Sequence, residues 1–422
     1  MALGRLERTG AETVNDRTDT AAIDRADAGA LADVKVLELG SMLAGPFIGT
    51  LLADFGAEVI KVEKPGTPDP LRDWPPHKDG VPLWWKSMAR NKRLVTLDLA
   101  RAEARELASR LIERSDIVIE NFRPGTLERW GLGPDALSAR CPRTIWVRVS
   151  GYGQTGPYRT RGGYATIAEG FSGLASFTGF PETGPMVSAF PLGDYVAGVF
   201  GAFGALMALH HRGRAGRGQV VDVSLFEPLF RILEAVTLRF DQTGEKKPRL
   251  GNQMEEDVPR NVYAAADGGH IAVSCGSQKI FENLLEALGV PELKGDPRFA
   301  TMALRATHRA VIDGVVRTWM ASQGTEAALA RLEAHGVVAG RIFDIEDVFR
   351  DPHYAARQAI VTILDAQLGP VRMPAPVPKL STTPGTIRWT GKPPGEDNEF
   401  VYRTVLGLEA EALDRLRQAR VI

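Results

Sequence analysis

Hydrophobic and polar positions change along the first part of the chain in a pattern that predicts strands and helices in alternation. A short apolar run at 34–39 is followed by apolar positions at helical spacing over 41–55, and then by an apolar, β-branched run at 58–62. Short apolar runs that end at turn residues are typical of buried strands, whereas apolar residues three or four positions apart are typical of helices. Residues 34–62 are therefore predicted to form a β-α-β unit.

The same alternation continues well beyond this unit. Further strands are predicted at 94–97, 117–119, 144–149 and 219–224, with one helix at 102–114 and another that ends near residue 209. Strands and helices that alternate in this way form a parallel sheet covered on both faces, as in Rossmann-like α/β proteins. Ligands of such sheets bind beyond the carboxyl ends of the strands. The loops after Leu39, Val62 and Ile119 are therefore expected to form the functional site.

The pattern changes in the second half of the chain. Residues 241–259 are polar and rich in proline, glycine and mixed charges, as linkers are, and a hairpin at 261–274 with helices at 280–288 and 306–321 indicates a smaller α+β domain. The sequence thus predicts a disordered N-terminal extension at 1–30, the first part of a large domain at 31–225, a linker at 226–260, a small α+β domain at 261–324, and a return to the large domain with a C-terminal tail at 325–422.

The overall charge argues against nucleic acid or an anionic membrane surface as the main partner. The chain holds 51 basic and 52 acidic residues, for a formal net charge of −1. A nearly neutral protein attracts polyanions only weakly, so an anionic ligand must meet a local group of cations.

The cysteines and the terminus indicate a cytoplasmic protein. Cys141 and Cys275 match no metal-ligand spacing and suit a reducing compartment, so no metal site is expected. The polar segment at 1–30 lacks the apolar core of a signal peptide. The most apolar stretch, at 196–209, is shorter than the roughly 20 residues of a membrane span and is predicted to be a buried helix.

The first strand-to-helix turn excludes two common nucleotide sites. Residues 40–45 read GSMLAG, without the three-glycine spacing of a dinucleotide-binding loop or the Lys-Ser/Thr ending of a phosphate loop. A nucleotide-dependent dehydrogenase built on the same kind of sheet is therefore disfavoured.

Six motifs follow one another in a specific order along the chain. They are VKVLEL at 34–39, AGP at 44–46, LADFGAEVIKVE at 52–63, NKR at 91–93, ENFRPG at 120–125 and SGYGQTGP at 150–157. In this order they resemble the family III CoA-transferases, also called the CaiB/BaiF family, which include formyl-CoA transferase, carnitine CoA-transferase and the α-methylacyl-CoA racemases. The resemblance continues through Asp194 and the strand at 216–224, and so covers nearly all of the chain after about residue 33.

The resemblance implies an activity and an assembly. The activity is transfer of CoA between an acyl-CoA and a carboxylic acid through an enzyme-bound anhydride and an enzyme-bound CoA thioester, with CoA as co-substrate and no permanently bound cofactor. The assembly is an obligatory dimer of two subunits interlocked like links, a feature of which the hydrophobic pattern gives no hint.

Several candidate CoA ligands lie near the predicted strand ends, where the phosphates of CoA need cations and backbone donors. The cations are Lys64, Arg72, Lys92, Arg93 and Arg129. By resemblance, Lys64, Arg129, Asn121 and Phe122 match CoA contacts of the family. For each single cation, a solvated surface position is an equally good explanation. Similarly, Trp84, Trp85 and Met88 suit either an acyl pocket or the core.

The expected catalytic carboxylate is missing from its usual place. The family's nucleophilic aspartate follows a Gly-aromatic pair, and here Ala165 occupies that position. Glu169, one helical turn further on, is the nearest replacement, although it could instead pair with Arg159 or Arg161. An acidic residue at 194 is explained by a helix N-cap.

Two alternatives stay open from the sequence. The chain could be a non-catalytic CoA-binding subunit that pairs with a sister chain, because Ala165 cannot act as a nucleophile. A racemase is less favoured, since the histidine and aspartate of that branch fall on Tyr164 and Ala165.

Overall fold

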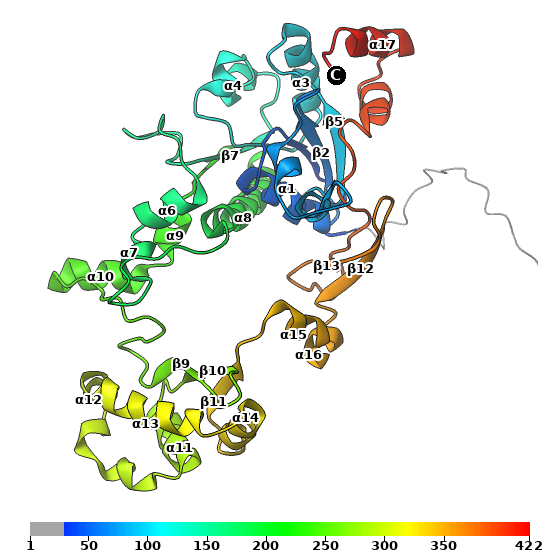
Figure 1. The fold of residues 1–422 in the computed structure, drawn as a ribbon. Coiled ribbons are helices and arrows are strands. Elements are labelled where there is room, and N and C mark those ends of the chain that lie inside the picture. Colours follow the sequence, from blue (N-terminus) through cyan, green and yellow to red (C-terminus); the bar gives the residue numbers. More distant parts are fainter. Residues whose placement is uncertain (1–28) are drawn as a thin grey trace, which may run out of the picture.

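A six-stranded parallel sheet forms the centre of the large domain (Figure 1). The computed structural model describes residues 29–422, so the predicted extension at 1–30 lies almost wholly outside the described residues. The strands, in the order β5-β2-β1-β6-β7-β8, are β5 (Lys92–Thr96), β2 (Glu58–Glu63), β1 (Lys35–Glu38), β6 (Ile117–Glu120), β7 (Ile145–Ser150) and β8 (Val220–Ser224). The predicted α/β class with a parallel sheet is confirmed.

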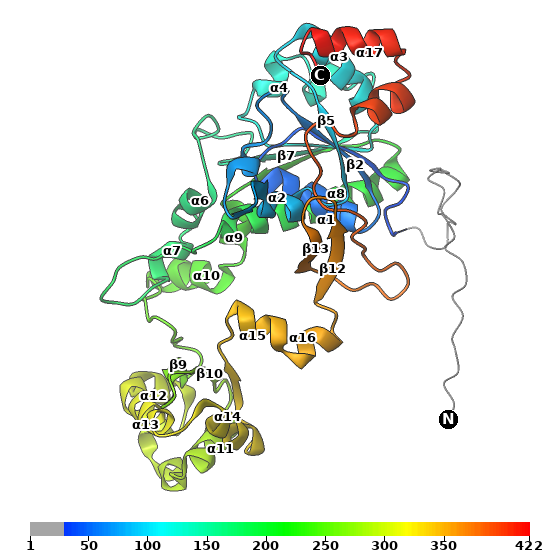
Figure 2. The same cartoon turned by 45° about the vertical axis from the view of Figure 1, so that its right-hand side comes forward.

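Helices cover both faces of this sheet (Figure 2). On one face lie α1 (Ala44–Asp54) and α8 (Leu192–Ala215), packed on alternate strand residues such as Val36 and Ile117. On the other face lie α3 (Ala102–Glu113), the π-helical turn Phe400–Val405 and α17 (Ala410–Gln418), packed on residues such as Leu37 and Val118. Successive side chains of a strand point to opposite faces, so each apolar strand serves both layers.

Small residues allow α8 to lie close against α1. A Cβ atom on Gly201 would stand 2.5 Å from Cδ1 of Ile48, a distance that real Cβ atoms do not show. The glycine and alanine content of α8 therefore reflects close helix packing rather than flexibility.

The strand order places a crevice between β1 and β6. The chain builds the sheet outward from β1 in one direction and then from β6 in the other, and ligands of doubly wound sheets bind where the order reverses. The Asn121 side chain joins the two loops there: its Oδ1 accepts from Ser41 N at 2.9 Å, and its Nδ2 donates to the Ser41 carbonyl at 2.8 Å.

The small domain extends further along the chain than predicted. Its three-stranded antiparallel sheet consists of β9 (Arg260–Ala264), β10 (His270–Ser274) and β11 (Val338–Arg341), covered by α11 (Gln278–Leu288), α12 (Met302–Thr307), α13 (Arg309–Ala321) and α14 (Thr325–Ala334). The predicted boundary at residue 324 is too early, because β11 pairs with β10 and Leu332 of α14 is buried in the small-domain core.

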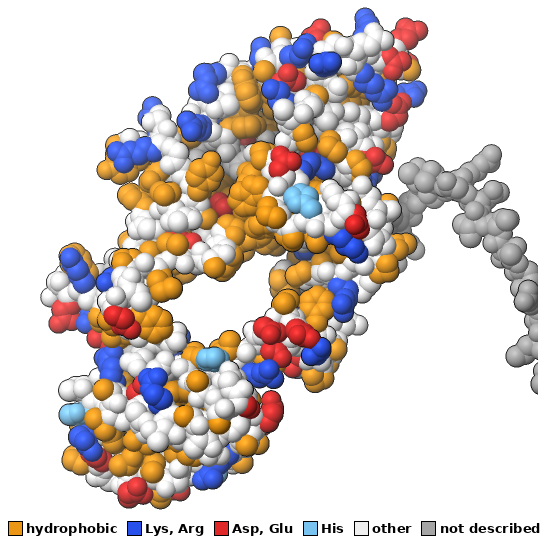
Figure 3. All heavy atoms as spheres, viewed as in Figure 1, with side chains coloured by type: hydrophobic (Ala, Val, Ile, Leu, Met, Phe, Trp, Pro, Cys, Tyr) orange, Lys and Arg blue, Asp and Glu red, His pale blue; other side chains and the backbone are white. Residues whose placement is uncertain are grey.

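Two separate connections join the domains. The connection from the large domain to the small domain corresponds to the linker predicted at 226–260, and it contains two helices, α9 (Glu227–Arg231) and α10 (Glu234–Thr243). The returning connection contains α15 (Ile345–Arg350), α16 (Pro352–Ala356) and the hairpin of β12 (Ile360–Asp365) and β13 (Gly369–Pro374). Shorter elements are β3 (His77–Lys78), β4 (Val81–Pro82), α2 (Leu83–Met88), α4 (Thr126–Arg129), α5 (Pro134–Leu137), α6 (Ala165–Phe171) and α7 (Leu174–Phe177). The two domains and their connections surround an open passage through the molecule (Figure 3).

Candidate active site

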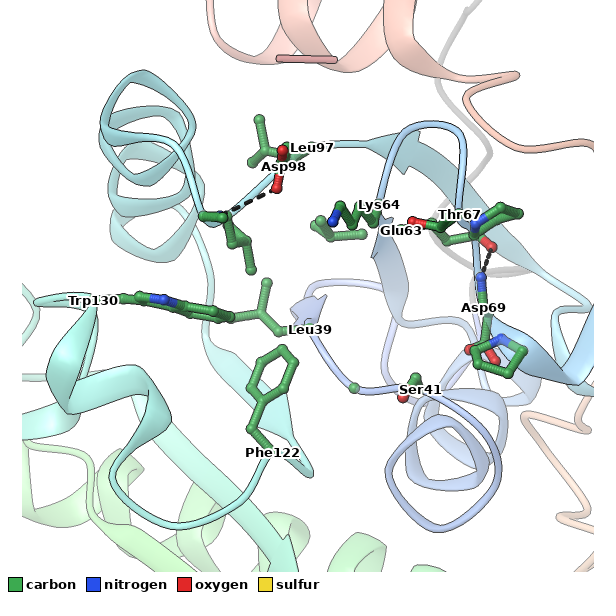
Figure 4. A pocket seen from close by; sticks show the side chains of 16 residues that line it. Leu39, Ser41, Glu63, Lys64, Thr67, Asp69, Leu97, Asp98, Phe122 and Trp130 are labelled. Atoms are coloured by element: carbon green, nitrogen blue, oxygen red, sulfur yellow. Dashed lines mark hydrogen bonds between the residues drawn. The ribbon is translucent and has the colours of Figure 1, made fainter. Parts of the chain in front are cut away.

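Two cavities lie at the carboxyl ends of β1 and β6. The first cavity has a volume of about 380 Å³ and is bordered by Leu39, Lys64, Leu97, Asp98, Phe122 and Trp130 (Figure 4). The second cavity has a volume of about 260 Å³ and is bordered by Ala44, Asn121, Arg123, Arg161, Tyr164 and Asp194. Ser41 and Phe122 border both cavities, so the two are neighbours along the crevice.

The first cavity combines aromatic surface with a free cation. Phe122 and Trp130 meet edge to face, with ring centroids 5.4 Å apart, and lie across from Lys64 in Figure 4. Lys64 is exposed and forms no ion pair with any residue of 29–422. An aromatic and aliphatic wall can stack a planar heterocycle, and a free ammonium group can bind a phosphate. Arg129, whose guanidinium donates to Thr126 Oγ1 at 3.0 Å, is also exposed beside Trp130.

Two other predicted cations are already engaged within the chain. The guanidinium of Arg72 forms an ion pair with Glu63 at 2.7 Å and stacks over the ring of Trp85 at 3.8 Å. Arg93 forms an ion pair with Glu58 at 3.2 Å. Because each guanidinium already has an acidic partner within the chain, neither is a free cation for a CoA phosphate.

Lys92 is buried in the core and cannot reach a CoA phosphate, so the sequence-based assignment is wrong for this residue. Its Nζ lies 2.8 Å from Glu38, and Glu38 also lies 3.0 Å from Lys61, with all three side chains at most 1% exposed. Lys61 in turn forms an ion pair with Asp69 at 2.8 Å. Burial lowers the pKa of Lys92 to about 8 although Glu38 opposes this shift, whereas Asp69 and Glu38 outweigh burial and raise the pKa of Lys61.

This buried charge cluster holds the loop that precedes α1. The Lys61 ammonium donates to the Gly40 carbonyl at 2.8 Å, and the Asp69 carboxylate accepts from Met42 N at 3.0 Å. Met42 adopts a φ of 65°, which is unfavourable for a side chain of its type. The sequence analysis did not identify this cluster of Glu38, Lys61 and Asp69. Charged residues inside apolar strands such as β1 and β2 could have indicated it, because such residues are rarely buried unless they are paired.

The aromatic candidates belong mainly to the core. Trp85 and Met88 are 1% and 4% exposed and pack with Leu43 and Leu71. Trp84 is partly buried and donates its Nε1–H to the Tyr195 hydroxyl at 3.1 Å. Of the predicted acyl-pocket cluster, none borders the second cavity in residues 29–422.

Glu169 is buried away from both cavities. Its side chain is 2% exposed, Oε2 accepts from Ser188 N at 2.8 Å, and Oε1 has no partner within the described chain. Arg159 and Arg161 form no ion pair with it, and Arg161 instead stacks over the ring of Tyr158 at 3.7 Å. Neither cavity is bordered by Glu169.

Asp194 borders the second cavity instead of capping a helix. Helix α8 begins at Leu192, with Pro191 at its N-cap and no side-chain capping bond, so the N-cap interpretation is wrong. The Asp194 carboxylate has no hydrogen bond or ion pair among the described residues, and burial raises its pKa to about 6.

Position 165 lies against the start of α8. Ala165 is the first residue of α6 and is 5% exposed. A Cβ atom on Gly193 would stand 3.1 Å from the Ala165 Cα, so the two backbones are in direct contact. Asp194 therefore follows immediately after the residue that touches position 165.

Comparison with known proteins finds one family along nearly the whole chain. The family model described as CoA-transferase family III matches residues 31–398. A succinyl-CoA--D-citramalate CoA-transferase from Chloroflexus aurantiacus is 45% identical over 393 residues, which are 93% of this chain and 98% of the relative. The beta subunit of a succinyl-CoA--L-malate CoA-transferase from the same organism is 41% identical over 396 residues, with coverage of 93% and 98%.

The solved structures agree with the sequence relatives. A CaiB/BaiF family protein from Brucella suis superposes with a TM-score of 0.80 at 32% identity, over 90% of this chain and 100% of that one. The similarity therefore concerns both domains and their connections, and is not confined to the parallel sheet.

Proposed function

The chain belongs to CoA-transferase family III and catalyses acyl-CoA:carboxylate CoA transfer, and from this premise we propose that it moves CoA from succinyl-CoA to a small dicarboxylic acid. The relatives named above use succinyl-CoA with citramalate or L-malate, and a succinate--glutarate CoA-transferase from Agrobacterium fabrum is 34% identical over 348 residues. The alternative of a non-catalytic subunit is not favoured, because two of these three relatives are named as transferases without reference to subunits, while the L-malate enzyme is named as a beta subunit.

The observation that carries this proposal is the pair of cations in the second cavity. Arg123 and Arg161 both border it, both are exposed, and neither forms an ion pair within residues 29–422. Guanidinium groups bind carboxylates with two parallel hydrogen bonds. A volume of about 260 Å³ suits a short acid, and a second carboxylate would give the arginines a partner while the first one reacts.

The first cavity is the proposed site of CoA. Its aromatic wall of Phe122 and Trp130 would stack the adenine, and Lys64 and Arg129 would bind phosphates. Asn121 supports this site indirectly, because both ends of its amide are bound to the Ser41 backbone. The acyl end would then enter the second cavity beside the start of α1, where the first backbone N–H groups of a helix lack intrahelical partners and suit a thioester oxygen.

Trp130→Ala should weaken CoA binding by about 5- to 150-fold, since loss of one base-stacking surface costs about 1–3 kcal/mol. Lys64→Ala should weaken it too, and the loss should shrink at high salt because an exposed charge is screened. Calorimetric titration with CoA measures both effects. Trp319→Ala in the small domain is the control and should bind like wild type, whereas unchanged affinity in Trp130→Ala would place CoA elsewhere.

The function is tested by incubating the purified protein with succinyl-CoA and a panel of acids. We expect new acyl-CoA thioesters with dicarboxylic acceptors such as malate, citramalate or glutarate, and much slower transfer to acetate, because acetate leaves the arginines unpaired. Chromatography and mass analysis of the thioesters give both rates. Tight CoA binding without exchange to any acid would instead support the role of a partner subunit.

The opening through the molecule leads us to propose a second copy of the chain as partner. Helix α8 has the length and hydropathy of a membrane span, yet only 44% of its most apolar window is buried. Its outer face carries Val199, Phe203 and Met207 at four-residue spacing, each more than half exposed. A second subunit threaded through the passage seen in Figure 3 is the proposed partner of this exposed stripe, as expected for interlocked rings.

A further inference from the structure

The proposed reaction needs a carboxylate that can reach the thioester, and few carboxylates border the two cavities. Three border the first cavity: Glu63 is paired with Arg72, Asp69 is paired with Lys61, and Asp98 is paired with Arg101 at 3.6 Å. A carboxylate held by an internal cation is a poor nucleophile, because attack would break the ion pair. None of these three is free to react.

In the second cavity, Asp194 is the one carboxylate among the described residues that border it. It has no hydrogen-bond or ion-pair partner in residues 29–422, in contrast to the carboxylates of the first cavity. It also follows Gly193, whose backbone contacts that of Ala165, the position where the family's aspartate is expected. Asp194 therefore borders the cavity, has no internal partner among the described residues, and follows the residue that contacts position 165.

We infer that Asp194 is the nucleophile of this enzyme and takes the role left vacant by Ala165. The inference rests on the proposed CoA transfer. An Asp194 oxygen attacks the thioester carbonyl carbon, the carbon–sulfur bond breaks, and the CoA thiolate leaves with the electron pair, so that a mixed anhydride forms. The thiolate then attacks the aspartyl carbonyl carbon and expels the donor acid as its carboxylate. The acceptor carboxylate reverses both steps, and no net proton or electron is consumed.

The surroundings of Asp194 suit this role. Burial raises its pKa to about 6, so the carboxylate is more basic than usual but still mostly ionised at neutral pH. The charged and titratable groups that border the same cavity are Arg123, Arg161 and Tyr164, and Tyr195 follows Asp194 in α8. None of these is hydrogen-bonded to Asp194 within the described chain, so the attacking oxygen is not occupied.

The test is covalent trapping with succinyl-CoA on the full-length dimeric or monomeric protein as purified. Hydroxylamine converts an enzyme-bound thioester to a hydroxamate, which peptide mass mapping locates to a residue. We expect the label at Asp194 in wild type, its loss together with at least a thousandfold loss of exchange in Asp194→Asn, and near-normal label and exchange in Glu169→Gln. The Kd for CoA should stay unchanged in both variants, which shows that they are folded.

The outcomes separate this inference from the proposed function. Exchange by wild type with the label at Glu169 or another residue, or exchange that survives in Asp194→Asn, overturns the inference and leaves the transferase intact. Absence of exchange in wild type overturns both.

The pH profile is an independent readout: wild-type kcat/KM should fall about tenfold per pH unit below pH 6, since only the ionised carboxylate attacks. A flat profile between pH 5 and 7 contradicts the assignment.

Discussion

Glu38→Gln is expected to lower the free energy of unfolding by about 3–5 kcal/mol, because it removes one partner from a buried ion pair and leaves an uncompensated charge. Glu38 is shared by Lys61 at 3.0 Å and Lys92 at 2.8 Å. Lys61 keeps its second partner, Asp69, in the variant. Lys92 keeps only the hydrogen bond to the Pro46 carbonyl, at 2.6 Å. Most of the lost stability therefore comes from the unpaired ammonium group of Lys92.

Urea unfolding at neutral pH measures this loss as a shift in midpoint at constant slope. The matched control is Glu346→Gln, which removes the partner of Arg350 in an exposed pair whose side chains are 63% and 76% exposed. Such pairs contribute about 0–1 kcal/mol, so this variant should unfold almost like wild type. A loss below about 1 kcal/mol in Glu38→Gln would show that the cluster tolerates an unpaired lysine.

The stability lost in Glu38→Gln should also depend on pH. In the folded protein burial lowers the pKa of Lys92 to about 8, against 10.5 in an exposed lysine. Between those values the unfolded chain holds a proton that the folded chain has released, so stability rises with pH. Removal of Glu38 lowers the folded pKa further. The deficit of Glu38→Gln against wild type should therefore be largest in mildly acid solution, become smaller as the pH rises toward 8, and stay constant above pH 8, where both folded proteins have released the Lys92 proton.

The sheet could be predicted from the sequence because its evidence is local. Each strand is a short apolar run with turn residues at its end, and each covering helix shows its own periodicity. The end of the small domain could not be predicted in the same way. Strand β11 pairs with β10, in which Ile271 faces Arg341, and a pairing across so many residues leaves no trace in the local pattern.

The site was only partly predictable, because burial and partnership are properties of the folded chain. Lys92 and Lys64 both lie near strand ends in the sequence, yet one is buried against Glu38 and the other is exposed at the first cavity. The motif comparison identified Ala165 as an anomaly, but spacing along one helix pointed to Glu169. Asp194 borders the cavity from another helix, and the contact between the backbones of Gly193 and Ala165 exists only in the folded chain.

Phe203→Asp combined with Met207→Asp is expected to prevent assembly of the enzyme. The two side chains are 55% and 51% exposed in the single chain and lie one helical turn apart on α8. In an interlocked pair they would be covered by apolar surface, where an unpaired carboxylate costs several kcal/mol. Light scattering on the eluting protein should give a dimer for wild type and monomer or aggregate for the double variant, with loss of transfer activity.

Gln418→Asp at the exposed end of α17, on the opposite face of the sheet, is the control for added charge and should leave the dimer intact. A double variant on α8 that stays dimeric and active would show that the stripe is not the interface.

Subunit exchange distinguishes interlocked rings from a dimer that merely touches along α8. The ring of this chain is closed by its C-terminal segment, in which Val401, Tyr402, Leu413 and Val421 are each at most 1% exposed, in the core between the sheet and α3. Linked rings can separate only if that segment leaves the core, which amounts to large-scale unfolding. Tagged and untagged dimers mixed under native conditions should therefore stay unmixed for days, whereas mixed dimers should form after unfolding in urea and refolding together. Mixing within minutes without denaturant would exclude the interlocked arrangement while leaving a dimer in place.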